Sequence, residues 1–163
     1  MVEALKNLLR KRRPPARAGH LELGERGERA ALKYLEEYEG YEIVATNFLV
    51  PLGRGLRGQK LTAEIDIVAY DQGTLAFVEV KTRLSNDTFP PEHAVDLRKQ
   101  RQIARAARRY RQLMSVRDEP YRYDVVTVVP VGRKNRIELF RSYFDDSIFH
   151  RSRYFRTHDH PGS

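Results

Sequence analysis

The sequence predicts a mixed α/β fold with three layers, in which a central β-sheet lies between helices. Residues 23–39 and 92–114 carry apolar side chains at the spacing of an amphipathic helix. Residues 63–83 alternate between apolar and polar types on both sides of a turn, as two antiparallel strands do. Residues 123–130 are dense in β-branched side chains, which is typical of a buried strand. The predicted order is helix, three strands, helix, strand and one further strand.

Composition points to a single basic domain. The chain has 163 residues, and its 30 Lys and Arg against 22 Asp and Glu give a net charge of +8. This excess favours a polyanionic partner such as nucleic acid. The absence of cysteine excludes disulfides and thiolate metal sites and is typical of a cytoplasmic protein. We expect neither a membrane partner nor a secretory signal, since there is no long uncharged apolar run and no signal-like order of residues at the start.

We divide the chain into three parts. Residues 1–20 are predicted to be a basic N-terminal arm broken at Pro14-Pro15, residues 21–150 the folded domain, and residues 151–163 a flexible C-terminal tail. His158 and His160 lie in this tail and are expected to be solvent-exposed rather than metal ligands.

The first helix is predicted from Leu23 to about Glu39, where Gly40 ends it. Glu28 falls on the apolar face of this helix, so its carboxylate is expected to point toward the core. The alternative is a first-turn glutamate that the helix dipole favours. The apolar face itself consists of Ala31, Leu32, Leu35 and Tyr38.

A strand at 41–48 is predicted to lead into a mobile, Gly- and Arg-rich loop at 51–62 that enters the site. Arg54, Arg57 and Lys60 can contact phosphates there, because glycine lets the backbone approach closely. A solvated connecting loop is the alternative interpretation.

The hairpin predicted at 63–83 carries the acidic and basic side chains of a candidate site. Alternation places Ile65 and Ile67 on one face of its first strand. A two-residue loop at Gln72-Gly73 and a four-residue loop from Asp71 to Thr74 give the same strand register. In that register Asp66 lies opposite Glu79.

Two carboxylates about 5 Å apart repel each other unless a cation lies between them. Oxygen-only ligands favour Mg²⁺ or Mn²⁺ over zinc. Lys81 projects on the same side as Glu79, where an ammonium can hold a water beside the metal or stabilise charge on a phosphate. The alternative is a solvated hairpin with a cross-strand pair between Glu64 and Lys81.

The second helix, predicted at 92–114 after Pro90-Pro91, has an arginine-rich outer side, whereas its Lys99 is directed toward the packed side. A solvated basic face is the default interpretation, and a phosphate-binding surface is the functional one. The last strands are predicted at 123–130 and, as an edge strand, at 136–140. The candidate nucleic-acid contacts are Arg54, Arg57, Lys60, Arg83, Arg98, Lys99, Arg101 and Arg105.

Several motifs together resemble those of the YraN-like family of small bacterial proteins. They are Gly24-Glu25-Arg26-Gly27-Glu28, Gly40-Tyr41, Asn47, Glu64-Ile65-Asp66, Phe77-Val78-Glu79-Val80-Lys81-Thr82-Arg83, Ala94-Val95 with Lys99, and Arg122-Tyr123-Asp124-Val125-Val126. This family is similar to archaeal Holliday junction resolvases, in the restriction-endonuclease-like PD-(D/E)xK superfamily. The resemblance implies a restriction-endonuclease-like αβββαβ core.

The resemblance also implies functions for individual residues. Asp66 and Glu79 become metal-binding carboxylates, Lys81 the catalytic lysine, and Glu28 an acidic residue that the first helix sends to the same metal and catalytic site. The expected protein is a Mg²⁺- or Mn²⁺-dependent endonuclease on DNA phosphodiesters, including structured or branched DNA in repair or recombination, and a homodimer is a further expectation. The alternatives are a nucleic-acid-binding protein on the same fold without cleavage, or an adaptor for an acidic protein.

Overall fold

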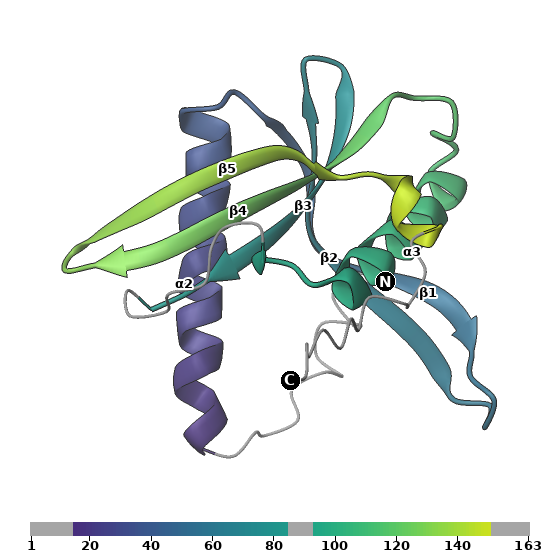
Figure 1. Ribbon diagram of the computed structural model, residues 1–163, viewed down its shortest axis with the longest axis horizontal. Coiled ribbons are helices and arrows are strands. Elements are labelled where there is room, and N and C mark those ends of the chain that lie inside the picture. Colours follow the sequence, from purple (N-terminus) through teal and green to yellow (C-terminus); the bar gives the residue numbers. More distant parts are fainter. Residues whose placement is uncertain (1–14, 85–92, 151–163) are drawn as a thin grey trace, which may run out of the picture.

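The computed structural model describes residues 15–84 and 93–150 as a five-stranded mixed sheet with helices on both faces (Figure 1). The strands lie in the order β1-β2-β3-β4-β5, and all neighbours are antiparallel except β3 and β4, which are parallel. The elements are α2 (Pro15–Glu37), β1 (Glu42–Arg54), β2 (Lys60–Asp71), β3 (Thr74–Thr82), α3 (Leu97–Leu113), β4 (Tyr121–Val131), β5 (Lys134–Phe144) and the 3₁₀ turn η2 (Asp146–Phe149).

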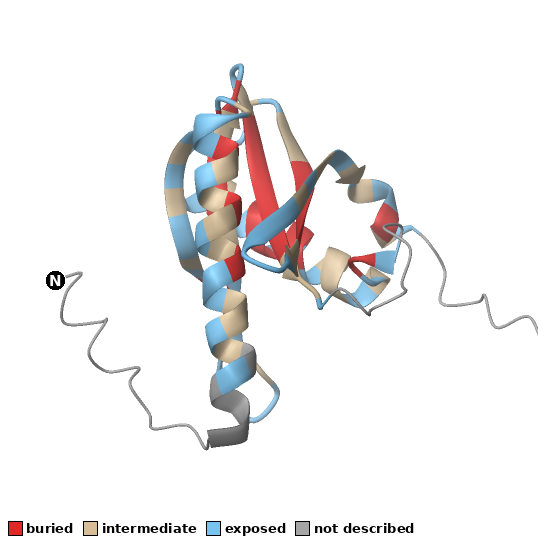
Figure 2. Cartoon of the chain, turned by 90° about the vertical axis from the view of Figure 1, so that its left-hand side faces the viewer, coloured by how far each residue is buried: buried red, intermediate tan, exposed pale blue. Residues whose placement is uncertain are grey.

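The two helices cover opposite faces of the sheet, and each encloses its own apolar core. Ala31 and Leu35 of α2 pack with Val78 and Val126 in one cluster, whereas Ala106 and Ala107 of α3 belong to the other. Burial follows this pattern: the central strands β3 and β4 and the sheet-facing side of α2 are buried, whereas residues 21–26 of α2 are exposed or half-buried (Figure 2). The three-layer α/β prediction is confirmed, with β5 as an added edge strand.

The helix boundaries differ from the prediction. α2 begins at Pro15 rather than Leu23, because proline is tolerated at a first helical position, where its missing N–H would have no helical partner. Its last residue is Glu37. α3 begins at Leu97 rather than residue 92, and the Asp96 side chain caps it by accepting from the Lys99 N–H at 2.8 Å. Pro90-Pro91 lies outside the described residues, as do residues 1–14 and 151–163.

The prediction of a loop over residues 51–62 is wrong. β1 continues to Arg54 and pairs there with Lys60 of β2, so only residues 55–59 form the turn. Gly53 and Gly58 adopt positive φ angles of 108° and 76°, which suit glycine, and let the chain reverse in this short space. The Gly55 N–H closes the turn on the Gln59 carbonyl at 2.8 Å.

The register of the β2–β3 hairpin and the alternation of β3 are confirmed, but the alternation of β2 is not. Ile67 pairs with Val78 as predicted. Ile65, however, packs in the α3 cluster and Ile67 in the α2 cluster, so the two residues do not share a face. Opposite this break Asn47 has a φ of 50°, in the left-handed region that asparagine tolerates better than most residues. Beyond the break β1 and β2 continue as a two-stranded extension, residues 47–66, called the β-ribbon below.

The last strands lie where they were predicted and are longer. β4 is largely buried, and β5 forms the sheet edge. Aromatic residues near the end of the described chain return to the core, as expected: the Phe144 ring stacks on Tyr123 at 4.5 Å. In the part of the chain that the structure describes, neither helix combines the length and the apolar character needed to span a membrane.

Candidate active site

The candidate site lies where β2 and β3 part. Their ladder ends at the pair Ile67–Val78, and beyond it an Asp66 carboxylate oxygen accepts from the Val80 N–H at 2.8 Å. Asp66 and Glu79 are therefore not a ladder pair, although the register places them opposite each other. The side chain of Asp66 binds the amide group of β3 that follows the end of the ladder.

Glu79 is a buried carboxylate with two cationic partners. Only 3% of the residue is exposed, and its Oε1 lies 2.7 Å from the Lys81 Nζ and 3.2 Å from the Lys99 Nζ. A buried carboxylate needs such compensation, because removing its charge from water is expensive. The expected position of Lys81 beside Glu79 is confirmed. The cross-strand partner proposed for it, Glu64, instead accepts from the Asn47 amide at 3.0 Å.

Glu28 reaches the site from α2. Its Oε2 accepts from the same Asn47 amide at 3.0 Å, so this asparagine links the helix carboxylate to Glu64 of β2. The preceding Gly27 lies against β3, where an added Cβ would come within 1.7 Å of the Thr82 Oγ1. The close approach that glycine permits therefore positions Glu28 against the sheet.

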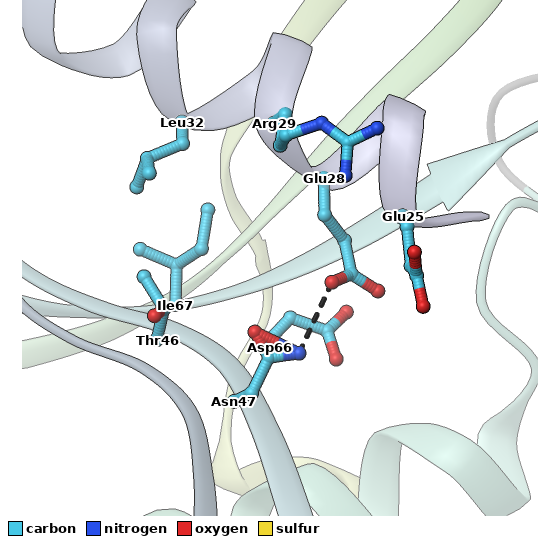
Figure 3. A pocket seen from close by; sticks show the side chains of 8 residues that line it. All are labelled: Glu25, Glu28, Arg29, Leu32, Thr46, Asn47, Asp66 and Ile67. Atoms are coloured by element: carbon cyan, nitrogen blue, oxygen red, sulfur yellow. Dashed lines mark hydrogen bonds between the residues drawn. The ribbon is translucent and has the colours of Figure 1, made fainter. Parts of the chain in front are cut away.

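Glu28 and Asp66 line one pocket between α2 and the bend of β1 and β2 (Figure 3). Figure 3 shows their carboxylates pointing toward one another, with the Asn47 amide bonded to Glu28. The pocket has a volume of about 270 Å³, enough for a hydrated cation. Its walls are completed by Glu25, Arg29, Leu32, Thr46, Asn47 and Ile67.

The carboxylates affect one another electrostatically. Burial, and then the charge of Glu79, raise the pKa of Asp66 to about 7, while the Val80 N–H and Lys99 oppose the shift. Burial raises the pKa of Glu28 as well, followed by the charges of Glu64, Glu25 and Glu79. Near neutral pH Asp66 is consequently only partly ionised unless a further cation approaches it.

The donor set suits a hard divalent cation. Within residues 15–84 and 93–150 no three acidic or histidine side chains are grouped closely enough to hold a metal as they stand. The available ligands are nevertheless all carboxylate oxygens, and since burial and Glu79 raise the pKa of Asp66 to about 7, a further cation would favour its ionised form. Both properties fit Mg²⁺ or Mn²⁺. Asp66, Glu79 and Glu28 are the residues that would hold the ion.

Comparison with known proteins identifies the family. A model of the "Uncharacterised protein family UPF0102" matches residues 27–128, more than half of the chain. The chain belongs to the UPF0102 family. It is 41% identical over 125 residues to a UPF0102 protein of Desulfosudis oleivorans, covering 77% of this chain and 91% of the relative. It is 39% identical over 132 residues to one of Bacteroides thetaiotaomicron, covering 81% and 99%. The YraN-like family resemblance is thereby confirmed.

The predicted phosphate contacts of this UPF0102 protein come from different elements. Arg54, Arg57 and Lys60 lie at the exposed end of the β-ribbon, and Arg98 is exposed on α3. Lys99 instead belongs to the acidic site through Glu79.

The remaining three arginines contact the protein itself. The Arg83 guanidinium donates to the His93 carbonyl at 3.2 Å, and the Arg101 Nε donates to the Ile148 carbonyl at 3.0 Å. The Arg105 guanidinium lies 6.0 Å from the centre of the Phe149 ring. Arg83 and Arg101 are half-buried, whereas Arg105 is exposed.

The sequence pattern predicted no site role for Asn47 of the UPF0102 chain, and it predicted a nucleic-acid contact rather than a partner in the acidic site for Lys99. Asn47 bridges Glu28 and Glu64, and an asparagine inside an otherwise apolar strand was the available signal. Lys99 pairs with Glu79, and its place within the apolar stripe of the helix indicated its direction but not its partner.

Proposed function

We propose that this protein is a metal-dependent endonuclease that hydrolyses DNA phosphodiesters. The observation that carries the proposal is that Asp66, Glu79 and Glu28, from three different elements, lie near one another. Besides burial, the charge of Glu79 raises the pKa of both Asp66 and Glu28, and the ammonium group of Lys81 is paired to Glu79. An acidic group of this kind on a chain with net charge +8 is suited to a polyanion that arrives together with a divalent cation.

The residues have separable tasks in this proposal. Asp66, Glu79 and Glu28 bind Mg²⁺ or Mn²⁺, which supplies Lewis-acid polarisation of the phosphate and a more acidic bound water. Lys81 orients the attacking water and stabilises negative charge that develops on the phosphate. Lys99 pairs with the buried carboxylate of Glu79 and holds it in place. Asn47 holds Glu28 toward the same pocket.

The sequence resemblance supports the choice of reaction. The motifs at Asp66 and at Glu79 to Lys81 are similar to those of PD-(D/E)xK nucleases, including archaeal Holliday junction resolvases. We therefore propose structured or branched DNA among the substrates.

The test is divalent-dependent cleavage of junction, flap and linear DNA by the purified full-length chain. We expect cleavage with Mg²⁺ or Mn²⁺ and none with a chelator. Asp66→Asn and Lys81→Met should lower the rate at least about 100-fold, the usual scale for losing an electrostatic or general acid–base contribution. Arg117→Ala, an exposed change beyond α3, is the control. Undiminished cleavage by Asp66→Asn would show that the assignment is wrong.

A second candidate is a nucleic-acid-binding protein on the same fold without cleavage. It is favoured by the two ammonium groups at Glu79, which already neutralise the most buried carboxylate of the site. Salt-sensitive DNA binding that does not respond to Mg²⁺ or Mn²⁺, in a protein that cleaves none of the three substrates, would identify this function.

A further inference from the structure

The β-ribbon is a two-stranded extension of the sheet with one face covered. β1 and β2 remain paired to Arg54 and Lys60, whereas β3 pairs with β2 only over Ile67–Asp71. One side of the ribbon packs on α3, where the Phe48 ring meets Tyr110 edge-on at 5.1 Å between centroids. Figure 1 shows the ribbon extending from the body of the sheet on the side away from α2.

The free part of the β-ribbon is both basic and apolar. No acidic residue occurs from Ile43 to Ala63, and the three charged residues in that interval are Arg54, Arg57 and Lys60. Leu56 at the turn is fully exposed, and Leu49 and Leu61 are 44% and 41% exposed. Exposed leucines among cations suit an anionic partner that also offers apolar contact.

The turn that presents Leu56 has internal hydrogen bonds. The Arg54 guanidinium donates to the Gly58 carbonyl at 3.1 Å, and the Gly58 N–H donates to the Gly55 carbonyl at 2.9 Å. The Gln59 side-chain oxygen accepts from the Arg57 N–H at 3.1 Å. The turn is therefore built to hold Leu56 at its apex, which lowers the entropy lost when a partner binds there.

We propose that the β-ribbon is an arm that enters the major groove of B-form duplex DNA. A two-stranded ribbon fits that groove, and an apolar side chain at its tip can contact thymine methyl groups. The deep, narrow major groove of an RNA duplex would not admit it, and a single strand has no groove. The inference deepens the proposed function, on which it rests for its relation to cleavage, by naming B-form duplex DNA as the substrate class.

The position of the arm gives its reach. Asp66 stands at the base of the β-ribbon, and the strand from there to Lys60 covers roughly 20 Å at about 3.3 Å per residue. That length corresponds to about six base-pair steps of duplex. Protection from methylation at guanine N7, a major-groove atom, should therefore appear about six base pairs from the phosphodiester at the acidic site.

Binding is measured by fluorescence anisotropy with the full chain and without divalent ions. The probes are a duplex DNA, its single strand and the matching RNA duplex. The ribbon variant combines Arg54→Ala, Arg57→Ala and Lys60→Ala. Its matched control removes the same charge from the β4–β5 hairpin through Arg133→Ala, Lys134→Ala and Arg136→Ala. Leu56→Ala is compared with Leu113→Ala, a leucine at the end of α3 that is 43% exposed.

The wild type should prefer duplex DNA over both other probes. The ribbon variant should bind duplex at least about 10-fold more weakly than its control, with the slope of log affinity against log salt reduced by up to about 3. Leu56→Ala should weaken duplex binding by up to about 10-fold with an unchanged slope, and Leu113→Ala should not.

Three results would overturn the proposal: equal losses in the two charge variants, no preference for duplex DNA, or conversion of a wild-type dimer to a monomer by Leu56→Ala in sedimentation. The last would identify a second copy of the chain as the partner of the tip. Because no divalent ion is present, these results are independent of cleavage. If the protein cleaves no substrate but the ribbon variant loses duplex binding, the result supports the DNA-binding arm and contradicts the nuclease proposal.

Discussion

The surroundings of Asp66 only partly stabilise the negative charge of its carboxylate. Its carboxylate accepts from the Val80 N–H, yet burial and Glu79 raise its pKa to about 7 from an ordinary value of 3.8. Glu79 differs, since two lysines lie against one of its oxygens. The site therefore contains one neutralised carboxylate and one that a bound cation would stabilise further.

The first prediction concerns stability and pH. Between about pH 4 and pH 7 the folded state retains a proton on Asp66 that the unfolded chain releases, so the free energy of unfolding of the wild type falls as pH rises through this window. Asp66→Asn removes this penalty while still offering an oxygen to Val80. The free energy of unfolding of Asp66→Asn, relative to that of the wild type, should be higher at pH 8 than at pH 5 by about 1 kcal/mol or more. Urea denaturation at both pH values without divalent ions measures it.

Glu36→Gln is the matched control, since it removes a carboxylate from the exposed side of α2. A pH dependence of the same size in both variants would contradict the assignment to Asp66. Added Mg²⁺ should stabilise the wild type at pH 8 and have little effect on Asp66→Asn, because ligand binding to the folded state raises its stability.

The second prediction concerns Lys99. Its ammonium lowers the pKa of Asp66, so Lys99→Met, which keeps the apolar stem, should raise that pKa further. The midpoint of the pH profile of Mg²⁺-dependent cleavage should then move to higher pH. The neighbouring exposed change Arg98→Met should leave the midpoint in place. A lower rate with an unmoved midpoint would mean that Lys99 acts on the substrate instead.

At the scale of elements, the contact of α2 with β3 determines where Glu28 lies. Gly27 is the first buried residue of the helix among those described, and it lies directly over Thr82. The Thr82 hydroxyl is buried without a hydrogen-bond partner, so the close packing of Gly27 on Thr82 leaves a polar group unsatisfied. The helix can approach the strand this closely only because residue 27 has no side chain.

The third prediction compares two glycines of α2. Gly27→Ala should destabilise the protein by about 1–3 kcal/mol through overpacking against Thr82. Gly24→Ala, where an added Cβ meets nothing within 4 Å, should stabilise it by up to about 1 kcal/mol. Thermal denaturation measures both. Thr82→Ala in the Gly27→Ala background should recover part of the loss, since it removes the closest atom, and a fully additive double variant would argue against the contact.

At the scale of the whole molecule, an ion network closes the sheet near the β2–β3 turn. Asp124 is 1% exposed and accepts from the Arg122 Nε at 2.9 Å and from the Tyr41 hydroxyl at 2.8 Å. Arg122 and Arg141 both also bind Asp71. The network joins β2, β4 and β5 with Tyr41, the residue before β1, at the end of the sheet away from the acidic site.

The fourth prediction separates the network from the site. Asp124→Ala should lower the free energy of unfolding by about 3–5 kcal/mol, because it removes a buried carboxylate that pairs with Arg122 and accepts from both Tyr41 and the Ser142 N–H. Tyr41→Phe loses one hydrogen bond and should cost about 1 kcal/mol. Denaturant unfolding gives both values. Tyr41→Phe should keep the metal dependence of the wild type, and a changed metal dependence would mean that the network also controls the site.

Several features follow from the sequence alone. The turn between β2 and β3, together with the period of two in β3, predicted the register that brings Asp66, Glu79 and Lys81 to one region. The helical period placed Glu28 on the inner side of α2. These features follow from local geometry, because strand and helix periods determine side-chain direction within one element. The order of the elements was readable for the same reason.

Tertiary structure decided the rest. The parting of β2 and β3, the left-handed Asn47 and the extension of 51–62 into a ribbon depend on contacts between strands and with α3, which no local pattern contains. Lys99 could be directed inward from its helix, but only packing of α3 on the sheet determined that Glu79 is its partner. Long-range contacts select among conformations that local propensity leaves nearly equal in free energy. At this site they determined where the strands separate and which side chains pair.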